Sequence, residues 1–109
     1  MVQPAIMMAY ITAPNRDAAL ALATVLVQER LVACANIHDG MTSIYWWQGE
    51  ARQEQETSLI VKTRADLIEA LKRRVCELHS YDVPCIVAWP IAEGHAPYLD
   101  WVRDETRKD

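Results

Sequence analysis

The fold is decided by the stretch LVACANIHDGMTSIYWW, which runs from Leu31 to Trp47 and holds two of the four tryptophans of the chain. Its β-branched and aromatic residues, Ile37 among them, suit a pleated and half-buried surface. Gly40 reaches a positive φ without steric cost. We therefore predict one long strand that is interrupted at Asp39 and Gly40, with a β-bulge as one form of the break.

The apolar residues at the end of this stretch occupy both faces of the predicted strand. Because side chains alternate along a strand, Ile44 and Trp46 lie on one face and Tyr45 and Trp47 on the other. The helices of a single small domain cover one face of a sheet. The sequence thus raises the question of what buries the second pair.

Length, charge and cysteine content narrow the class of protein. The chain has 109 residues, of which 51% are hydrophobic, and this predicts a single domain, residues 1–109. Oligomerisation would add to the apolar surface that such a small core buries. A net charge of -4 argues against nucleic acid as the main partner, and no apolar run approaches the roughly 20 residues that cross a membrane. Three cysteines without a CxxC pair, and no secretory leader, predict a reducing, cytoplasmic location.

The remaining elements follow from apolar periodicity and from helix and turn signals. In chain order we first predict a strand at 6–12, a helix from its N-cap Asn15 to Glu29, the long strand, a turn at Gln48 and Gly49, and a strand at 57–62. A second helix follows, with the capping box Thr63 and Asp66 and an apolar stripe made of Leu67, Leu71, Val75 and Leu78. The chain then continues with a strand at 85–89 and a short helix at 97–106. This order of elements predicts an α+β fold of the ferredoxin-like kind, in which two split β-α-β units form an antiparallel sheet with two helices on one face.

Three cysteines and three histidines offer ligands for copper or zinc. Cys34 and His38 would stand about 13 Å apart along their strand, too far to share one ion. Cys76 and His79 are i, i+3 neighbours on the predicted helix, and Cys85 follows a short loop later, so these three residues form the candidate metal site. The alternative, which the usual burial of free cysteine favours, makes both cysteines small core residues and His79 a polar helix end.

Enzyme chemistry finds little support, since the chain has no Gly-rich phosphate loop and no GxSxG, HExxH or paired-carboxylate motif. We expect a protein that is not an enzyme, although a Cys and a His that meet only in space stay open as a catalytic pair. Glu56 and Lys62 share a strand face but lie about 20 Å apart along it, so each needs another partner. A ligand-sensing alternative places Glu56, Lys62, Tyr81 and Trp101 around a cleft between subunits that takes a small anion or metabolite.

The aromatic residues favour assembly of several copies. Tyr45, Trp46, Trp47, Tyr81 and Trp101 exceed what one small core needs, and exposed edge strands must be paired or covered. Homo-oligomerisation through the hairpin resolves both problems and makes Tyr45, Trp46 and Trp47 the predicted interface. The alternative is that the tryptophans pack beneath the last helix.

Motifs along nearly the whole chain resemble the CutA family of divalent-cation tolerance proteins. They are TAP at 12–14, LVAC at 31–34 with Asn36, TSIYWWQG at 42–49, Glu56, Lys62 with Thr63, Tyr81 with Pro84, and Tyr98 with Trp101. The resemblance implies a ferredoxin-like fold, a homotrimer built by sheet-edge pairing like that of PII signalling proteins, and a role in tolerance of copper or another divalent metal ion.

The chain departs from that family at the copper ligands proposed for it. These are a cysteine just before TAP and two adjacent histidines ahead of the tyrosine, and here the positions hold Ile11, Leu78 and His79. The glutamate that usually follows Pro84 is Cys85, which would add a thiol near His79. We expect a cytoplasmic homotrimer that binds copper or another divalent cation, or else a small ligand, without nucleic-acid or membrane partners.

Overall fold

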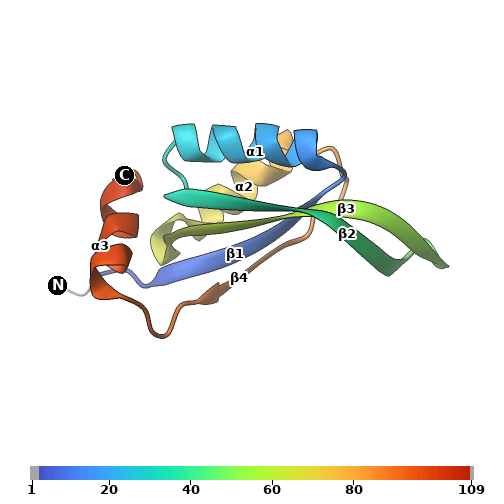
Figure 1. The fold of residues 1–109 in the computed structure, drawn as a ribbon. Helices are drawn as coiled ribbons and strands as arrows, with labels where there is room; N and C mark the ends of the chain where they lie inside the picture. The colour runs from blue at the N-terminus through green and yellow to red at the C-terminus, as the bar shows by residue number, and fades with distance from the viewer. Residues whose placement is uncertain (1–2, 109) are drawn as a thin grey trace.

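The computed structural model describes residues 3–108 as one antiparallel sheet with three helices (Figure 1). The strands are β1 (Ile6–Ala13), β2 (Cys34–Trp47), β3 (Glu50–Arg64) and β4 (Ile86–Pro90), and the helices are α1 (Arg16–Gln28), α2 (Ile68–Leu78) and α3 (Ala96–Glu105). The strand order across the sheet is β2-β3-β1-β4, and every pair is antiparallel. This confirms the α+β class and the antiparallel sheet.

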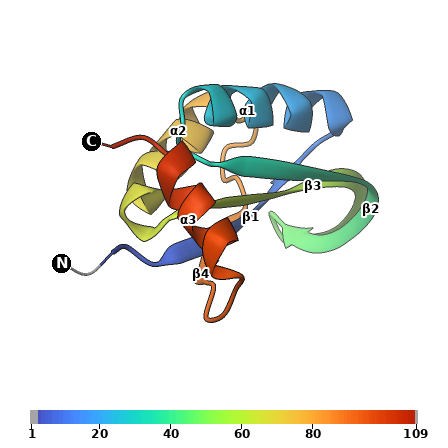
Figure 2. The same cartoon turned by 60° about the vertical axis from the view of Figure 1, so that its left-hand side comes forward.

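Helices α1 and α2 lie on one face of the sheet, whereas α3 stands at one end of it (Figures 1 and 2). The core lies between that face and the two helices, and its buried members are Ala9, Ile11, Leu22, Ala23, Leu26, Leu31, Val32, Leu59, Val61, Leu71 and Val75. Side chains alternate along β1 and β3, so the residues between these core positions point to the opposite face. We call that second surface, which α1 and α2 leave uncovered, the open face.

Helix α1 begins where the sequence predicts. The Asn15 side chain accepts a hydrogen bond from the backbone N–H of Ala18 at 2.8 Å, which satisfies one of the free donors of the first turn. Asp17 lies in that first turn, where its negative charge suits the helix dipole. The predicted N-cap is therefore confirmed.

Helix α2 begins later than the sequence predicts, because Thr63 is a strand residue. Its hydroxyl donates to the Leu31 carbonyl at 2.6 Å in the core, and Asp66 instead accepts two hydrogen bonds from Arg64. The predicted capping box is wrong, and a 3-10 turn at Ala65–Leu67 leads into the helix. The rest of the apolar stripe is buried as predicted up to its end, where Leu78 is 40% exposed.

Strands β2 and β3 form a long hairpin that turns at Gln48 and Gly49. Both turn residues have positive φ, 50° and 80°, as the tight two-residue turn requires. Trp47 therefore pairs with Glu50 directly, and the polar segment that follows is drawn into β3. The predicted strand at 57–62 is thus too short, because pairing with β2 rather than composition determines where β3 begins.

A β-bulge interrupts β2 where the sequence predicts a break. His38 pairs with Ser58 and Met41 pairs with Glu56, so two residues of β2 stand opposite one residue of β3. Gly40 lies in this bulge with a φ of 78°. The predicted alternation is confirmed, since Tyr45 and Trp47 continue the Met41 side of the hairpin while Ile44 and Trp46 lie on the other side.

Candidate functional site

The structure does not gather the predicted metal ligands. Within residues 3–108, no three side chains of His, Cys, Asp and Glu lie close enough together to hold one ion. Cys76 and Cys85 are both exposed free thiols, so the alternative that made them buried core residues is also wrong. A single chain thus offers no copper site from Cys76, His79 and Cys85.

The hydrogen bonds of His79 explain why it is a poor ligand. Its Nδ1 accepts the backbone N–H of Tyr81 at 3.1 Å, and its Nε2 lies 2.7 Å from the carbonyl oxygen of Thr12. Because a carbonyl only accepts, Nε2 must carry the proton, and the ring is the neutral Nε2–H tautomer. Both ring nitrogens are occupied within the chain, so neither has a lone pair available for a metal ion.

Two of the four predicted cleft residues do meet. The Tyr81 hydroxyl donates to Oε2 of Glu56 at 2.8 Å. Burial of the ring and this hydrogen bond raise the pKa of Tyr81 well above its usual range. No lysine or arginine of the described residues forms a salt bridge with Glu56, and the donor that the structure gives its carboxylate is the Tyr81 hydroxyl.

The negative charge of Glu56 raises the pKa of other groups on the open face. Desolvation raises the pKa of Tyr10, and its electrostatic interactions with Cys85 and Glu56 raise it further. Desolvation of the sulfur and the Glu56 charge also raise the pKa of Cys85, although the residue as a whole is exposed. Tyr10 donates to the Met41 sulfur at 3.2 Å. This end of the open face therefore keeps its hydroxyl and thiol groups protonated.

The other two predicted cleft residues lie in a separate cluster near α3. Lys62 donates to the side-chain oxygen of Asn36 at 2.7 Å and pairs directly with Cys34 across the β2–β3 ladder. The Cys34 sulfur lies 3.5 Å from the Tyr98 hydroxyl, and the rings of Tyr98 and Trp101 are 5.6 Å apart. The predicted cleft thus divides into a Glu56–Tyr81 pair and a group around Lys62 and Trp101.

Strand register explains which members of the second group the sequence missed. Cys34, Asn36 and Tyr98 were not predicted for the cleft, and only the β2–β3 pairing brings the first two beside Lys62. The contact with Cys34 raises the pKa of Tyr98 to about 12, with burial of the ring as a second cause. We call Cys34, Asn36, Lys62, Tyr98 and Trp101 the Lys62 cluster.

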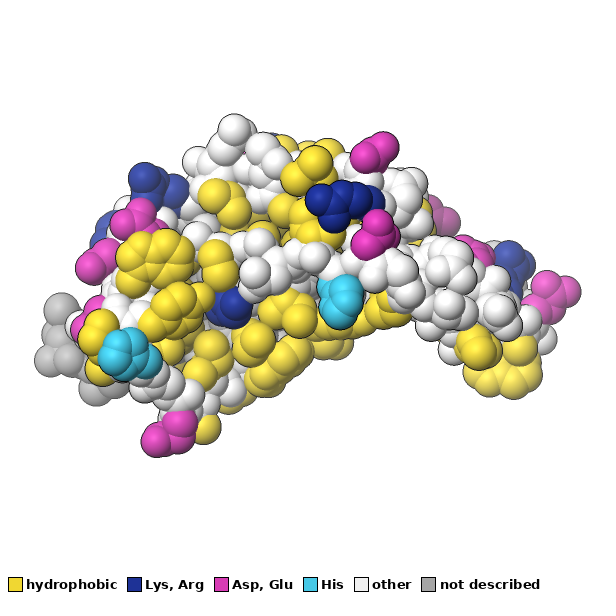
Figure 3. All heavy atoms as spheres, viewed as in Figure 1, with side chains coloured by type: hydrophobic (Ala, Val, Ile, Leu, Met, Phe, Trp, Pro, Cys, Tyr) yellow, Lys and Arg dark blue, Asp and Glu magenta, His cyan; other side chains and the backbone are white. Residues whose placement is uncertain are grey.

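The predicted interface residues are exposed on the β2–β3 hairpin, which projects beyond the helices in a molecule that measures 49 × 25 × 22 Å (Figure 1). Trp46 is 76% exposed, whereas Tyr45 and Trp47 are 37% and 38% exposed. The alternative that packs these tryptophans beneath the last helix is wrong for Trp46 and Trp47, because α3 lies at the other end of the sheet from the hairpin (Figure 1). Figure 3 shows hydrophobic side chains along the underside of the sheet and again at the hairpin tip.

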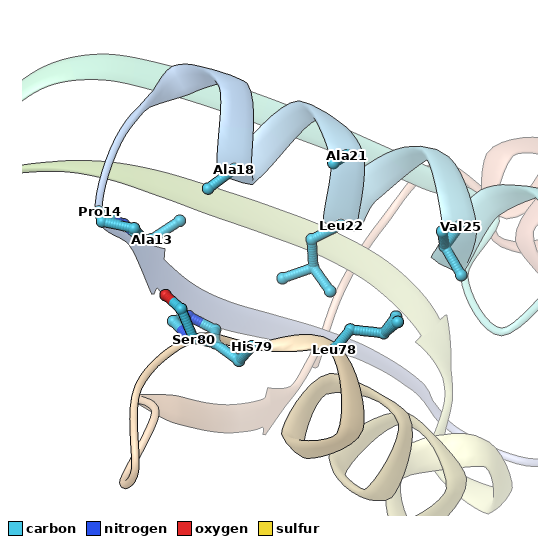
Figure 4. A pocket seen from close by; sticks show the side chains of 9 residues that line it. All are labelled: Ala13, Pro14, Ala18, Ala21, Leu22, Val25, Leu78, His79 and Ser80. Atoms are coloured by element: carbon cyan, nitrogen blue, oxygen red, sulfur yellow. The ribbon is translucent and has the colours of Figure 1, made fainter.

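An apolar cavity of about 210 Å³ lies between α1 and the end of α2 (Figure 4). It is lined by Ala13, Pro14, Ala18, Ala21, Leu22, Val25, Leu78, His79 and Ser80. The His79 ring nitrogens are bonded to Thr12 and Tyr81, so this histidine offers the cavity no free polar atom.

Among the described residues, no helix is long and apolar enough to cross a membrane.

Known proteins resemble the whole chain rather than one motif. Residues 7–105 match the family described as CutA1 divalent ion tolerance protein. A divalent-cation tolerance protein CutA of Thermus thermophilus is 54% identical over 96 residues, which cover 88% of this chain and 93% of that protein. Protein CutA 1, chloroplastic, of Oryza sativa subsp. japonica is 43% identical over 99 residues, and the match covers 91% of this chain but 56% of that longer protein.

The fold agrees with the sequence similarity. The crystal structure of CutA1 from Oryza sativa superposes with a TM-score of 0.95 at 40% identity, covering 98% of each chain. The divalent cation tolerance protein of Thermus thermophilus superposes with a TM-score of 0.91 at 51% identity, covering 94% of this chain and 99% of the other. The chain therefore belongs to the CutA1 family of divalent ion tolerance proteins.

Proposed function

We propose that the protein is a ferredoxin-like subunit of a homotrimer that acts in the tolerance of divalent cations, copper among them, in a reducing cytoplasm and without enzymatic activity. The single observation that carries the assembly is the exposed apolar surface of the sheet and its hairpin. Ile44 and Trp46 are 73% and 76% exposed at the hairpin, and Val87 and Trp89 are 53% and 41% exposed on β4. Exposed apolar surface of this extent is typical of an interface.

The two sheet edges support the same proposal. β2 and β4 are the outer strands, and within residues 3–108 each leaves a row of backbone groups without a strand partner. Pairing of these edges between copies would satisfy the unpaired backbone groups. The same assembly would place neighbouring copies over the open face. The number three rests on the resemblance to the CutA family. Light scattering in dilute solution tests it, and the mass of one chain would refute it.

The proposed copper role uses ligands from more than one subunit, because residues 3–108 of one chain do not bring three suitable donors together. The exposed thiols of Cys76 and Cys85 are the soft donors that each subunit offers. Native mass spectrometry of the protein with added copper tests this. We expect copper to stay with His79→Ala and to be lost from the double variant Cys76→Ser, Cys85→Ser. Copper bound equally by the double variant would refute the thiol ligands.

A second candidate function is the sensing of a small ligand, and the observation that favours it is the position of Lys62. This half-buried cation bonds to a neutral amide and forms no salt bridge in the described part of the chain. A thermal-shift screen with metal ions and with small anions separates the two functions, because a ligand that binds only the folded state raises Tm.

A further inference from the structure

We propose that the apolar cavity between α1 and the end of α2 is a binding site for a small neutral aromatic molecule with one N–H donor, of about the size of indole. This site is separate from the proposed thiol ligands and from the proposed interface. Its volume of about 210 Å³ exceeds the roughly 150 Å³ of an apolar cavity that takes up benzene. The origin of the cavity, its polarity and its place in the fold each support this assignment.

The cavity arises from the small side chains of α1. One stripe of this helix, with the spacing i, i+3, i+4 and i+7, lines the cavity, and its members are Ala18, Ala21, Leu22 and Val25. Packed helices lie about 8–10 Å apart, and the methyl groups of the two alanines are too short to fill that space. Figure 4 shows Leu22 directed towards Leu78 of α2, and the alanine side chains leave the hollow beside these two leucines.

The lining of the cavity selects a neutral ligand, because none of its side chains is charged. His79 is held as the neutral tautomer, with its ring nitrogens bonded to Thr12 and Tyr81. A charged ligand would lose its hydration there without gaining a partner. A rigid ring system fills an apolar space without losing rotatable bonds, so an aromatic molecule suits the cavity better than a flexible chain of the same size.

The Ser80 hydroxyl supplies a polar contact at one end of the cavity. It forms no hydrogen bond within residues 3–108. In Figure 4 its oxygen points towards Ala13 and Pro14, where the chain enters α1. A hydroxyl oxygen accepts from an N–H donor, so a ligand with a single N–H would be oriented by this contact. Water needs several polar partners, and an apolar ligand that displaces poorly bonded water gains affinity.

The cavity stays accessible in the proposed assembly. It lies in the helix layer, on the face of the sheet opposite to the open face (Figures 1 and 4). The surfaces proposed for contact between copies are the open face, the hairpin and the edges of β2 and β4. Neighbouring copies would therefore leave the helix layer exposed to solvent.

The extent of the apolar surface fits a small molecule rather than a protein. Of the described residues of α1 and α2, the exposed large hydrophobic ones are Leu20, Val27 and Leu78. Leu78 lines the cavity and is 40% exposed, so solvent reaches the cavity beside it, whereas Leu20 and Val27 lie outside the lining. The apolar surface of the helix layer is thus concentrated in the cavity and does not continue as a broad interface.

Amide NMR titration of the intact protein with indole tests the proposal, with benzofuran and indole-3-carboxylate as matched probes. We expect indole to cause saturable shifts at the amides around Ala18, Ala21 and Ser80, with a Kd of about 1 mM or lower. Benzofuran, which has the same shape but no N–H, should bind about 2- to 10-fold more weakly. Indole-3-carboxylate, which is charged at neutral pH, should bind about tenfold more weakly or not at all.

Two variants locate the site. Ala18→Leu places a larger side chain in the cavity and should weaken indole binding by about tenfold or more. The control Thr24→Leu adds a leucine to an exposed position of α1 outside the lining, and it should bind indole as the wild type does. Ser80→Ala removes the hydroxyl and leaves the apolar lining in place, so it should weaken indole by about 2- to 10-fold and leave benzofuran unchanged.

Several results would overturn the proposal. The wild type would show no saturable shifts with indole, or would show them on the open face instead of around the cavity. A folded Ala18→Leu variant that binds indole like the wild type, or equal binding of indole and indole-3-carboxylate, would also contradict it. If Ala18→Leu does not fold, the comparison of the three probes and the Ser80→Ala variant decide, and equal effects of Ser80→Ala on indole and benzofuran would refute the contact with Ser80.

Discussion

Replacing Trp46 by alanine should separate the proposed trimer into subunits that remain folded. The side chain is 76% exposed in the single chain, so most of its surface is available to a neighbouring copy. A tryptophan buries roughly 150–250 Å² when fully covered, and the 76% of it that is exposed here, at about 25 cal/mol/Å², gives about 3–5 kcal/mol for each interface. That corresponds to a loss of association of roughly a hundredfold or more at each contact. Within the subunit, the smaller covered part of the side chain contributes about 1 kcal/mol.

The assay is light scattering coupled to size exclusion over a range of protein concentrations. Wild type should keep the mass of three chains on dilution, whereas Trp46→Ala should fall towards the mass of one chain. Leu20→Ala is a matched control, because Leu20 is 49% exposed on α1, away from the hairpin. It should keep the wild-type mass.

Two outcomes would refute the reasoning in different ways. If Trp46→Ala keeps the wild-type mass at every concentration, the hairpin is not the interface. If the wild type itself has the mass of one chain, the inference from exposed apolar surface to assembly fails as a whole.

Three further predictions concern the folded subunit. Leu71→Ala should lower the free energy of unfolding by about 2–5 kcal/mol, because Leu71 is 0% exposed. Leu78→Ala should lower it by about 1 kcal/mol, because Leu78 is 40% exposed. Urea denaturation of both variants measures the difference. Thr63→Val should cost about 1–3 kcal/mol by leaving a buried carbonyl unsatisfied, whereas Thr24→Val, which removes a similar but exposed bond, should cost about 0.5 kcal/mol or less. Tyr81 has a raised pKa in the folded state, so wild type should lose stability above about pH 10, where the unfolded chain releases this proton first. Denaturation from pH 8 to 11 should show a smaller loss for Tyr81→Phe, and equal slopes would contradict it.

The parts of the fold that local chemistry determines could be predicted from the sequence. The Asn15 cap, the alternation around Trp46 and the break at Gly40 depend on residues near in sequence, and the structure confirms all three. Thr63 was misplaced because its hydroxyl has a distant partner, the Leu31 carbonyl, that a capping motif does not reveal. At Thr63, the hydrogen bond to a residue distant in sequence determines the structure, and the local capping motif does not.

The candidate site was harder to predict for the same reason. Glu56, Tyr81, Lys62 and Trp101 were named together as one cleft, and the structure divides them between the Glu56–Tyr81 pair and the Lys62 cluster. Their grouping depends on which strand lies beside which, and the strand spacing alone gave only the distance along β3. The exposure of Cys85 was missed because free cysteine is usually buried, and this one lies just before β4 begins.

The bulge at Asp39 and Gly40 determines which aromatic pair shares a side of the hairpin with the first half of β2. A Cβ added at Gly40 would meet no atom within 4 Å, so alanine there would strain the backbone but fit the space. Because the bulge absorbs one residue, Met41 lies on the same side of the hairpin as His38, although it follows three positions later. A regular β2 with the same residues would place Ile44 and Trp46 on that side, in place of Tyr45 and Trp47. Deleting one of the two bulge residues would leave a single residue opposite Thr57, so Trp46 would keep the side that it has now. The bulge, and not the aromatic sequence alone, thus decides which surface the hairpin offers to a neighbour.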